Sequence, residues 1–365
     1  MQHKNVPHVV VAPEMFLAEG GIARVSRHYL QAIAQSRPHS PLRVVVLNDN
    51  EVSAKRLRQH GATRAKAVAC SRNKARFLKA IWNATQTPGA HVTCTHVHLA
   101  PALWLLQRLA RRFTYDIVVH GIEVWKPLSK LQQISLTNSR RILSVSEYTR
   151  REILKRYPDL GSQIVVLPNA LDPSFTAINE KVVDSVPYSI LTVSRLAAHD
   201  HEKGIDHLIA AMPEVLTAQP DATLRIVGEG VDRKRLEELA AASSAMDSIT
   251  FLGFVADPEL KREFAQCSLF ALPSKKEGFG LVYLEAMSAG KPCIVADAGG
   301  APEVIGEQSG MIVPYADCPK LAAKVTEAFA KIWDPEKVRA RAEYFSLKSF
   351  SERWDGFSPE VSSHT

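Results

Sequence analysis

Two carboxylates around a glycine-rich turn are the side chains best spaced to do chemistry. Glu277 and Glu285 lie eight positions apart, with Gly278 and Gly280 between them and an apolar helical pattern following. Glycines let the backbone approach a ligand closely, and the first amides of a helix present free donors and a positive dipole end to a phosphate. A carboxylate accepts two hydrogen bonds side by side, which matches the vicinal hydroxyls of a hexose or ribose. The spacing predicts a sugar-nucleotide site, and a solvated helix start is the alternative when the pair is taken alone.

Apolar runs that end at polar or glycine residues surround this pair in the sequence. Each precedes a helical pattern, which is typical of strands in a parallel sheet, and open α/β sheets bind ligands at the carboxyl ends of such strands. The runs are residues 191–196, 224–230, 251–254, 269–274 and 291–297.

The order, spacing and residue types of these segments resemble family-4 glycosyltransferases of the GT-B fold. The resemblance is most specific from Leu191 to Val313 and extends more weakly over the whole chain. It implies an α/β protein with two Rossmann-like domains facing across a cleft. The last helix is expected to cross back to the N-terminal domain, where residues 349–354 resemble it.

The domain boundaries follow from length and composition read with this resemblance. A chain of 365 residues, 46% of them apolar, is long for a single core. We expect an acceptor-side domain over residues 1–172 and a nucleotide-sugar-binding domain over 188–333. The mixed polar stretch 173–187 reads as a linker, residues 334–358 as helices returning to the first domain, and 359–365 as a tail.

The resemblance also implies roles for individual residues. Glu277 would contact the donor sugar and Glu285 the nucleotide ribose. His120, at the end of the expected strand 117–119, would face the donor sugar, although a histidine at a strand end is more often structural. The other expected donor contacts are the backbone of Phe279, Gly280 and Leu281, the nucleobase border Gly253, Phe254 and Val255, and the loop glycines Gly20 and Gly21. A tight turn alone would also explain the last pair.

Arg195 and Lys203 are the candidates for the charge that builds on the leaving group. Breaking a sugar–diphosphate bond needs fixed positive charge or a metal in a dry cleft. The sequence has no Asp-x-Asp motif, so we expect a metal-independent enzyme without a cofactor, in which the two cations hold the diphosphate. Two surface cations are the alternative. Their interval of eight positions is longer than in many family members and includes residues 199–201.

Cys94, His96 and His98 alternate, which would place them on one face of the expected strand 92–97 and its continuation. A metal site there would need a fourth ligand that the sequence does not identify. The family often has a histidine at this strand end without using a metal, so we expect none here.

Charge divides the chain unevenly. Residues 1–172 hold 25 Lys and Arg against 10 Asp and Glu, whereas the remainder holds 20 against 28. The basic segment 55–79 contains no acidic residue, and apolar side chains accompany it, so part of it reads as a basic amphipathic helix for an anionic membrane surface or a lipid diphosphate. A solvated basic face is the alternative. Nucleic acid is not an expected partner, because no recognisable nucleic-acid-binding motif is present.

Five scattered cysteines suit a reducing compartment, and no stretch reaches the length of a spanning helix or a signal peptide. We therefore expect a cytoplasmic protein, peripheral on the inner face of the cytoplasmic membrane.

The predicted function is that of a retaining glycosyltransferase. It would move a hexose from a nucleoside diphosphate sugar to a hydroxyl of a lipid-linked saccharide in surface polysaccharide biosynthesis, such as exopolysaccharide or lipopolysaccharide. A soluble small-molecule or sugar-phosphate acceptor is the runner-up. A phosphorylase of the same fold and a non-catalytic sugar-nucleotide-binding subunit are further alternatives.

Overall fold

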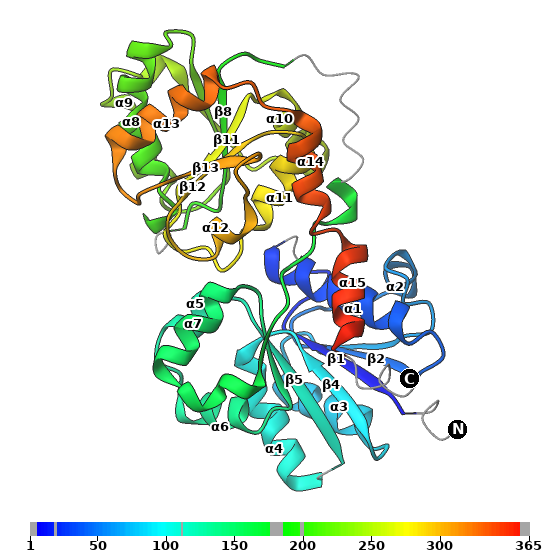
Figure 1. Ribbon diagram of the computed structural model, residues 1–365. Coiled ribbons are helices and arrows are strands. Elements are labelled where there is room, and N and C mark those ends of the chain that lie inside the picture. The colour runs from blue at the N-terminus through cyan, green and yellow to red at the C-terminus, as the bar shows by residue number, and fades with distance from the viewer. Residues whose placement is uncertain (1–5, 18–19, 111, 176–184, 198–200, 358–365) are drawn as a thin grey trace. The chain divides into compact units, whose positions relative to one another are not determined.

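The computed structural model describes residues 6–17, 20–110, 112–175, 185–197 and 201–357. The chain forms two compact units (Figure 1). The first comprises Met1–Ala170 together with Leu347–Thr365, and the second comprises Leu171–Ser346.

The first unit is built on a seven-stranded parallel sheet in the order β3-β2-β1-β4-β5-β6-β7. Its strands are β1 (His8–Ala12), β2 (Leu42–Val46), β3 (Lys66–Ala69), β4 (Ala90–Cys94), β5 (Phe113–Val119), β6 (Arg141–Ser144) and β7 (Ile164–Val166). All five residues of β1 are buried, as expected where helices cover both faces of a sheet. Because β1 pairs with β2 on one side and β4 on the other, the strand order reverses there, and ligands bind outside the carboxyl ends of strands at such a reversal.

Helices lie on both faces of this sheet (Figure 1). They are α1 (Gly21–Ser36), α2 (Ala54–Gln59), α3 (Lys74–Ala84), α4 (Ala100–Ala110), α5 (Ile122–Trp125), α6 (Lys130–Thr137) and α7 (Glu147–Arg156). One core cluster joins β1 and β4 to α3, α4, α6 and α7 through side chains such as Val11, Phe77, Leu103 and Ile153. Ser146 caps α7, since its side chain accepts a hydrogen bond from the Thr149 amide.

The last helix, α15 (Leu347–Gly356), completes the other face of the first unit by packing on α1. Tyr29 of α1 makes edge contacts with Phe350 and Trp354, at ring-centroid distances of 5.1 and 5.6 Å. Ser351 also lies 3.0 Å from the Gln35 side-chain oxygen. The expected return of the final helix to the first domain is therefore confirmed.

The second unit has a six-stranded parallel sheet in the order β10-β9-β8-β11-β12-β13. Its strands are β8 (Ser189–Val193), β9 (Thr223–Val227), β10 (Ile249–Gly253), β11 (Leu269–Leu272), β12 (Cys293–Ala296) and β13 (Gly310–Val313). Its helices are α8 (Ile205–Ala218), α9 (Arg233–Ala241), α10 (Asp257–Gln266), α11 (Leu281–Ser288), α12 (Ala301–Val304), α13 (Cys318–Ala330) and α14 (Pro335–Glu343). The order of strands reverses between β8 and β11.

Helix α14 differs from its expected place. Residues 334–358 read as helices that all return to the first domain, but α14 packs on α11 and belongs to the second unit. Of the expected linker 173–187, residues 176–184 lie outside the described residues, as does the expected tail 359–365.

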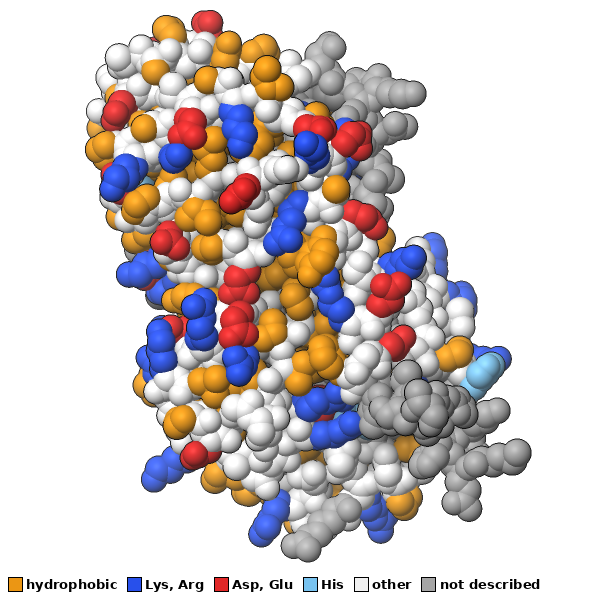
Figure 2. Space-filling view, viewed as in Figure 1, with side chains coloured by type: hydrophobic (Ala, Val, Ile, Leu, Met, Phe, Trp, Pro, Cys, Tyr) orange, Lys and Arg blue, Asp and Glu red, His pale blue; other side chains and the backbone are white. Residues whose placement is uncertain are grey.

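Part of the basic segment 55–79 is helical, as expected. The segment contains α2, the edge strand β3 and the first half of α3. On the visible face of the first unit, Lys and Arg side chains predominate, whereas both charge signs mix over the second unit (Figure 2).

Candidate active site

Lys203 and Glu277, which are 74 positions apart in the sequence, form a salt bridge in the second unit. Lys203 Nζ lies 2.5 Å from Glu277 Oε1, and both side chains are about 15% exposed. Lys203 ends a short 3-10 turn (His201–Lys203) before α8, and Glu277 follows β11. The pair therefore lies at the carboxyl ends of β8 and β11, where the strand order reverses and ligands bind in sheets of this kind.

A second glycine pair, which the sequence analysis missed, fixes the backbone of Glu277. The Gly300 amide donates to the Glu277 carbonyl at 2.6 Å. Gly299 has φ of +65°, and a side chain there would lie 2.5 Å from the same carbonyl oxygen. The available signal was a Gly-Gly pair directly between a strand and a helix, the pattern that we used for Gly20 and Gly21.

The start of α11 is shaped by Gly280, its N-cap residue. Gly280 has φ of +96°, and a Cβ there would lie 2.3 Å from the ring of Tyr283. The Tyr283 hydroxyl donates to the Leu272 carbonyl, and burial raises the pKa of Tyr283 well above its usual range. The Phe279 side chain is buried against Phe345, so only its backbone could serve the predicted donor contact. Glu285 lies one turn inside α11 and is 7% exposed.

The turn that carries Lys203 is anchored next to Glu277. The Lys275 amide donates to the Glu202 carbonyl at 2.7 Å, and the Ser274 hydroxyl donates to it at 3.3 Å. The Glu202 carboxylate pairs with Lys276. Glu202 was not among the predicted site residues. Because it holds the 3-10 turn against the loop after β11, it positions Lys203 for the salt bridge.

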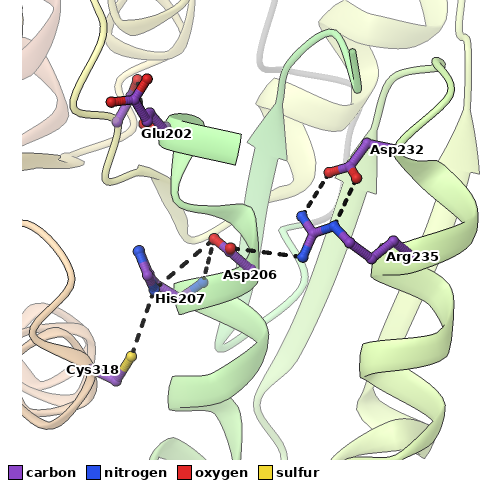
Figure 3. Close-up of polar contacts among 7 residues, drawn as sticks. Glu202, Asp206, His207, Asp232, Arg235 and Cys318 are labelled. Carbon is purple, nitrogen blue, oxygen red and sulfur yellow. Dashed lines mark hydrogen bonds and ion pairs between the residues drawn. The ribbon is translucent and has the colours of Figure 1, made fainter. Parts of the chain in front are cut away.

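Arg195 follows β8 directly, is exposed, and borders a small cavity shared with Asp206, Asp232 and Arg235. Arg235 lies between the two carboxylates, with its Nη2 2.7 Å from Asp232 and its Nη1 3.9 Å from Asp206 (Figure 3). The Asp232 amide donates to the Leu196 carbonyl. Arg235 thus connects the backbone next to Arg195 with the start of α8. Between them, residues 198–200 of the long loop lie outside the described residues.

The predicted nucleobase border begins at the last residue of β10, at the edge of the second sheet. Gly253 has φ of +72°, and a side chain there would meet the Glu229 carboxylate at 2.7 Å. Phe254 is 78% exposed, and Val255 is half-buried. An exposed aromatic ring beside a strand end offers a stacking surface.

In the first unit, His120 follows β5 and lies beside His96, at a ring-centroid distance of 5.6 Å. His120 Nε2 lies 2.7 Å from the Thr95 carbonyl, and the His120 amide donates to the Glu123 carboxylate at 2.5 Å. A carbonyl only accepts, so Nε2 carries the proton and, in the neutral ring, Nδ1 accepts. Burial, together with the charge of His120, lowers the pKa of His96 to about 4.

Gly20 and Gly21 lie at the start of α1, after β1, with Gly20 as its N-cap. Residues 18 and 19 of their loop lie outside the described residues. These glycines and His120 belong to the first unit, whereas the remaining predicted site residues belong to the second.

The alternation of Cys94, His96 and His98 does not place them on one strand face. Strand β4 ends at Cys94, and a 3-10 turn begins at Val97. The Cys94 thiol donates to the His96 carbonyl, the His98 amide donates to His96 Nδ1, and His98 is exposed. Within the described parts of the chain, no three His, Cys, Asp or Glu side chains are grouped to hold a metal ion.

Two Rossmann-like parallel sheets are the architecture of the GT-B class of glycosyltransferases. Gly20 follows β1 in the first, and Arg195 and Glu277 follow β8 and β11 in the second, at the reversals of strand order. A structure from Anabaena, HepE in complex with UDP and glucose, has the same fold, with a TM-score of 0.71 over 98% of this chain and 99% of that one at 18% identity.

Sequence comparison identifies the family. The profile described as "Glycosyltransferase Family 4" matches residues 19–175, and "Glycosyl transferases group 1" matches residues 176–344. The chain is 30% identical over 263 residues to a GDP-mannose-dependent alpha-(1-6)-phosphatidylinositol monomannoside mannosyltransferase of Mycolicibacterium smegmatis, covering 66% of this chain and 67% of that protein. The chain belongs to the family-4 glycosyltransferases.

A second relative, from Corynebacterium glutamicum, is a GDP-mannose-dependent monoacylated alpha-(1-6)-phosphatidylinositol monomannoside mannosyltransferase. It is 39% identical over 230 residues, covering 57% of this chain and 58% of its own. The chain spans between 53% and 62% of the length of the first curated relatives that it matches.

Proposed function

We propose that the chain is a retaining glycosyltransferase that moves a hexose from a nucleoside diphosphate sugar to a hydroxyl of a lipid-linked saccharide in surface polysaccharide biosynthesis. The observation that carries this proposal is the salt bridge of Lys203 and Glu277 at the reversal of strand order, next to the glycine-shaped start of α11. It supports the proposal because a carboxylate that could bind sugar hydroxyls, a cation and the first amides of α11 belong to one unit.

In the proposed reaction, the bond between the anomeric carbon and the diphosphate oxygen breaks, and the acceptor oxygen bonds to that carbon on the same face. The acceptor proton passes to the departing diphosphate. Arg195 and Lys203 neutralise the charge that builds on the leaving group, and the first amides of α11 share it. Glu277 binds sugar hydroxyls, Glu285 binds the ribose, residues 253–255 border the base, and His120 faces the sugar.

The lipid-linked acceptor is supported by the relatives. The two mannosyltransferases are named for phosphatidylinositol mannosides, which are sugars attached to lipids. Within the described residues, no helix is long and apolar enough to cross a membrane. In our proposal the enzyme meets its acceptor from the cytoplasmic face of the membrane, through the basic first unit.

A donor panel tests the transfer. Purified protein is incubated with UDP-glucose, UDP-galactose, UDP-N-acetylglucosamine and GDP-mannose, with EDTA or with added Mg²⁺, and both thermal stabilisation and hydrolysis are followed. We expect one donor to stabilise the protein and to be hydrolysed equally under both conditions. Hydrolysis that stops in EDTA and returns with Mg²⁺ would contradict metal independence.

The acceptor is tested with the donor so identified, carrying a radiolabelled sugar. Label that becomes extractable into butanol in the presence of membrane lipids supports a lipid acceptor. Label that stays in the aqueous phase on an added sugar phosphate supports the soluble alternative. Release of sugar phosphate only when inorganic phosphate is present would identify a phosphorylase.

A further inference from the structure

A groove of about 310 Å³ opens in the first unit between α3 and the edge of the sheet. In the register of β2 and β3, Arg43 lies opposite Lys66 and Val45 opposite Val68, so these four side chains share one sheet face. The α3 residues on the groove recur at helical spacing from Arg76 to Ala84 and form one helix face. The groove is therefore built by regular elements and not by a loop.

The groove has a cationic rim without a carboxylate among its lining residues. Arg43 is committed to the last turn of α3, because it donates to the Asn83 and Ala84 carbonyls at 2.8 and 3.0 Å. Lys66, Arg76 and Lys79 are exposed and make no ion pair with any carboxylate in the described parts of the chain. Three cations held close together without counter-charge attract an anion.

The floor of the same groove is aliphatic. Val45 is buried in the core, Ala80 and Ala84 lie beside it, and Val68 remains 38% exposed on the edge strand. Trp82, on the same helix, is 37% exposed, and tryptophan is enriched where apolar and aqueous phases meet. A free anion would need only the rim, whereas the floor adds a surface for hydrocarbon. No aromatic side chain lines the groove, which disfavours the bases of a nucleic acid.

We propose that this groove binds an anionic phospholipid, with the phosphate at Lys66, Arg76 and Lys79 and an acyl segment on the floor at Val68. This inference rests on the proposed function, in which the enzyme works at a membrane. The groove borders the edge strand β3, and β2 separates that strand from β1, where the strand order reverses. The bound lipid is thus an anchor, separate from the acceptor that receives the sugar.

The test is co-sedimentation of the full-length protein with vesicles of phosphatidylcholine alone or mixed with phosphatidylglycerol, at about 0.1 M salt. The rim variant is K66Q/R76Q/K79Q, the floor variant is Val68→Asp, and the matched control K55Q/R58Q/R64Q removes the same charge from exposed cations of the same basic segment outside the groove. Each basic residue in contact with an anionic surface contributes roughly fivefold to partitioning, so the rim variant, which loses three such contacts, should lose about a hundredfold in vesicle binding, whereas the control residues would not contact the lipid. Vesicle binding should fall tenfold or more in the floor variant and less than fivefold in the control.

Equal losses of vesicle binding in the rim variant and the control would mean that the whole basic segment attracts the membrane diffusely, and would overturn the proposal. Unchanged vesicle binding by Val68→Asp would mean that the groove binds only an anion and no acyl segment. In that case, millimolar inorganic phosphate at constant ionic strength should inhibit vesicle binding. Equal binding of wild-type protein to both vesicle types, or to single-stranded DNA and vesicles alike, would also overturn the proposal. Donor hydrolysis is measured in all variants. If it persists while lipid binding fails, only this inference fails, whereas its absence in the wild type counts against the proposed function.

Discussion

At the residue scale, Glu277 is held before any ligand arrives. Lys203 fixes its carboxylate and Gly300 its carbonyl, so the side chain needs little rearrangement when a sugar binds. Groups that are oriented in advance stabilise developing charge without a cost of reorganisation at the moment of reaction. The same salt bridge keeps the Lys203 cation beside Glu277.

Replacing Glu277 with Gln should lower kcat on the order of 10²-fold or more, because the amide keeps the shape of the carboxylate but loses its charge and paired acceptors. Thermal unfolding should stay close to that of the wild type. Glu307→Gln, at an exposed carboxylate of the same unit, is the control and should remain fully active. Near-normal turnover of Glu277→Gln at saturating donor would remove Glu277 from the site.

His96 makes stability depend on pH. Its pKa is about 4 in the folded protein because of burial, and 6.5 is its ordinary value. The unfolded chain therefore binds the proton first as the pH falls. The free energy of unfolding is thus highest above pH 6.5 and decreases by up to about 1.4 kcal/mol per pH unit down to pH 4. His8, whose pKa is also lowered by burial, adds to this loss.

Urea unfolding between pH 7 and pH 5 measures the effect. His96→Gln should flatten the fall in unfolding free energy, whereas His39→Gln, at an exposed position, should leave it unchanged. An identical slope in His96→Gln and the wild type would contradict the assignment.

The sequence predicted which residue types form the candidate site better than it predicted their contacts. Glu277 and Lys203 were both selected, but their salt bridge joins loops that only the pairing of β8 with β11 brings together. Gly299 and Gly300 were overlooked because their role is to fit the backbone of Glu277, a partner more than twenty positions away.

At the element scale, Arg235 fastens both sides of the loop between Arg195 and Lys203. It joins Asp232, whose amide holds Leu196, to Asp206 at the start of α8. Arg235 thus holds the loop from α9, a helix to which the resemblance assigned no site residue.

Arg235→Ala should raise the KM for the donor several-fold and increase hydrogen exchange of residues 195–197 and 201–206, with little effect on global unfolding, since exposed ion pairs contribute at most about 1 kcal/mol. Lys234→Ala is the matched control, because Lys234 pairs only distantly with Glu238 on the exposed side of the same helix. If both variants behave alike, Arg235 does not position the loop.

Whether a segment is a helix or a strand was predictable where apolar runs were long. The residues at which each element begins and ends were not. The expected strand 92–97 instead covers Ala90–Cys94. The chain turns at His96, because the His96 side chain accepts a hydrogen bond from the His98 amide at the start of the 3-10 turn. Strand β3 was missed because an edge strand with exposed Lys66 and Val68 lacks the continuous burial of its neighbours. Helix α14 was assigned to the wrong domain, since its sequence pattern does not indicate which helix it packs against.

At the scale of the whole molecule, the first unit depends on α15. Trp354 is 4% exposed and contacts Tyr29 and His8. Trp354→Ala should destabilise this unit by about 3–5 kcal/mol, the usual cost of removing a buried aromatic side chain. Hydrogen exchange should rise in β1 and α1, whereas the second unit should keep its protection and its donor binding.

Lys348→Ala, at an exposed position of the same helix, serves as the control and should leave exchange unchanged. Equal loss of protection in both units of Trp354→Ala would show that they unfold together, contrary to this expectation.

The chain enters the second unit at Leu171 and leaves it at Ser346, and the Leu171 amide donates to the Phe345 carbonyl at 2.7 Å. The second unit is thus an insertion whose two ends meet. During synthesis, the last residue of the second unit is added before α15, so the sequence of the unit that begins later is completed first. Residues 1–170 must wait, with the face of α1 that will cover Phe350 and Trp354 still open, until the final helix is made. A chain that ends at residue 346 should therefore hold a folded second unit beside a first unit that lacks its last helix.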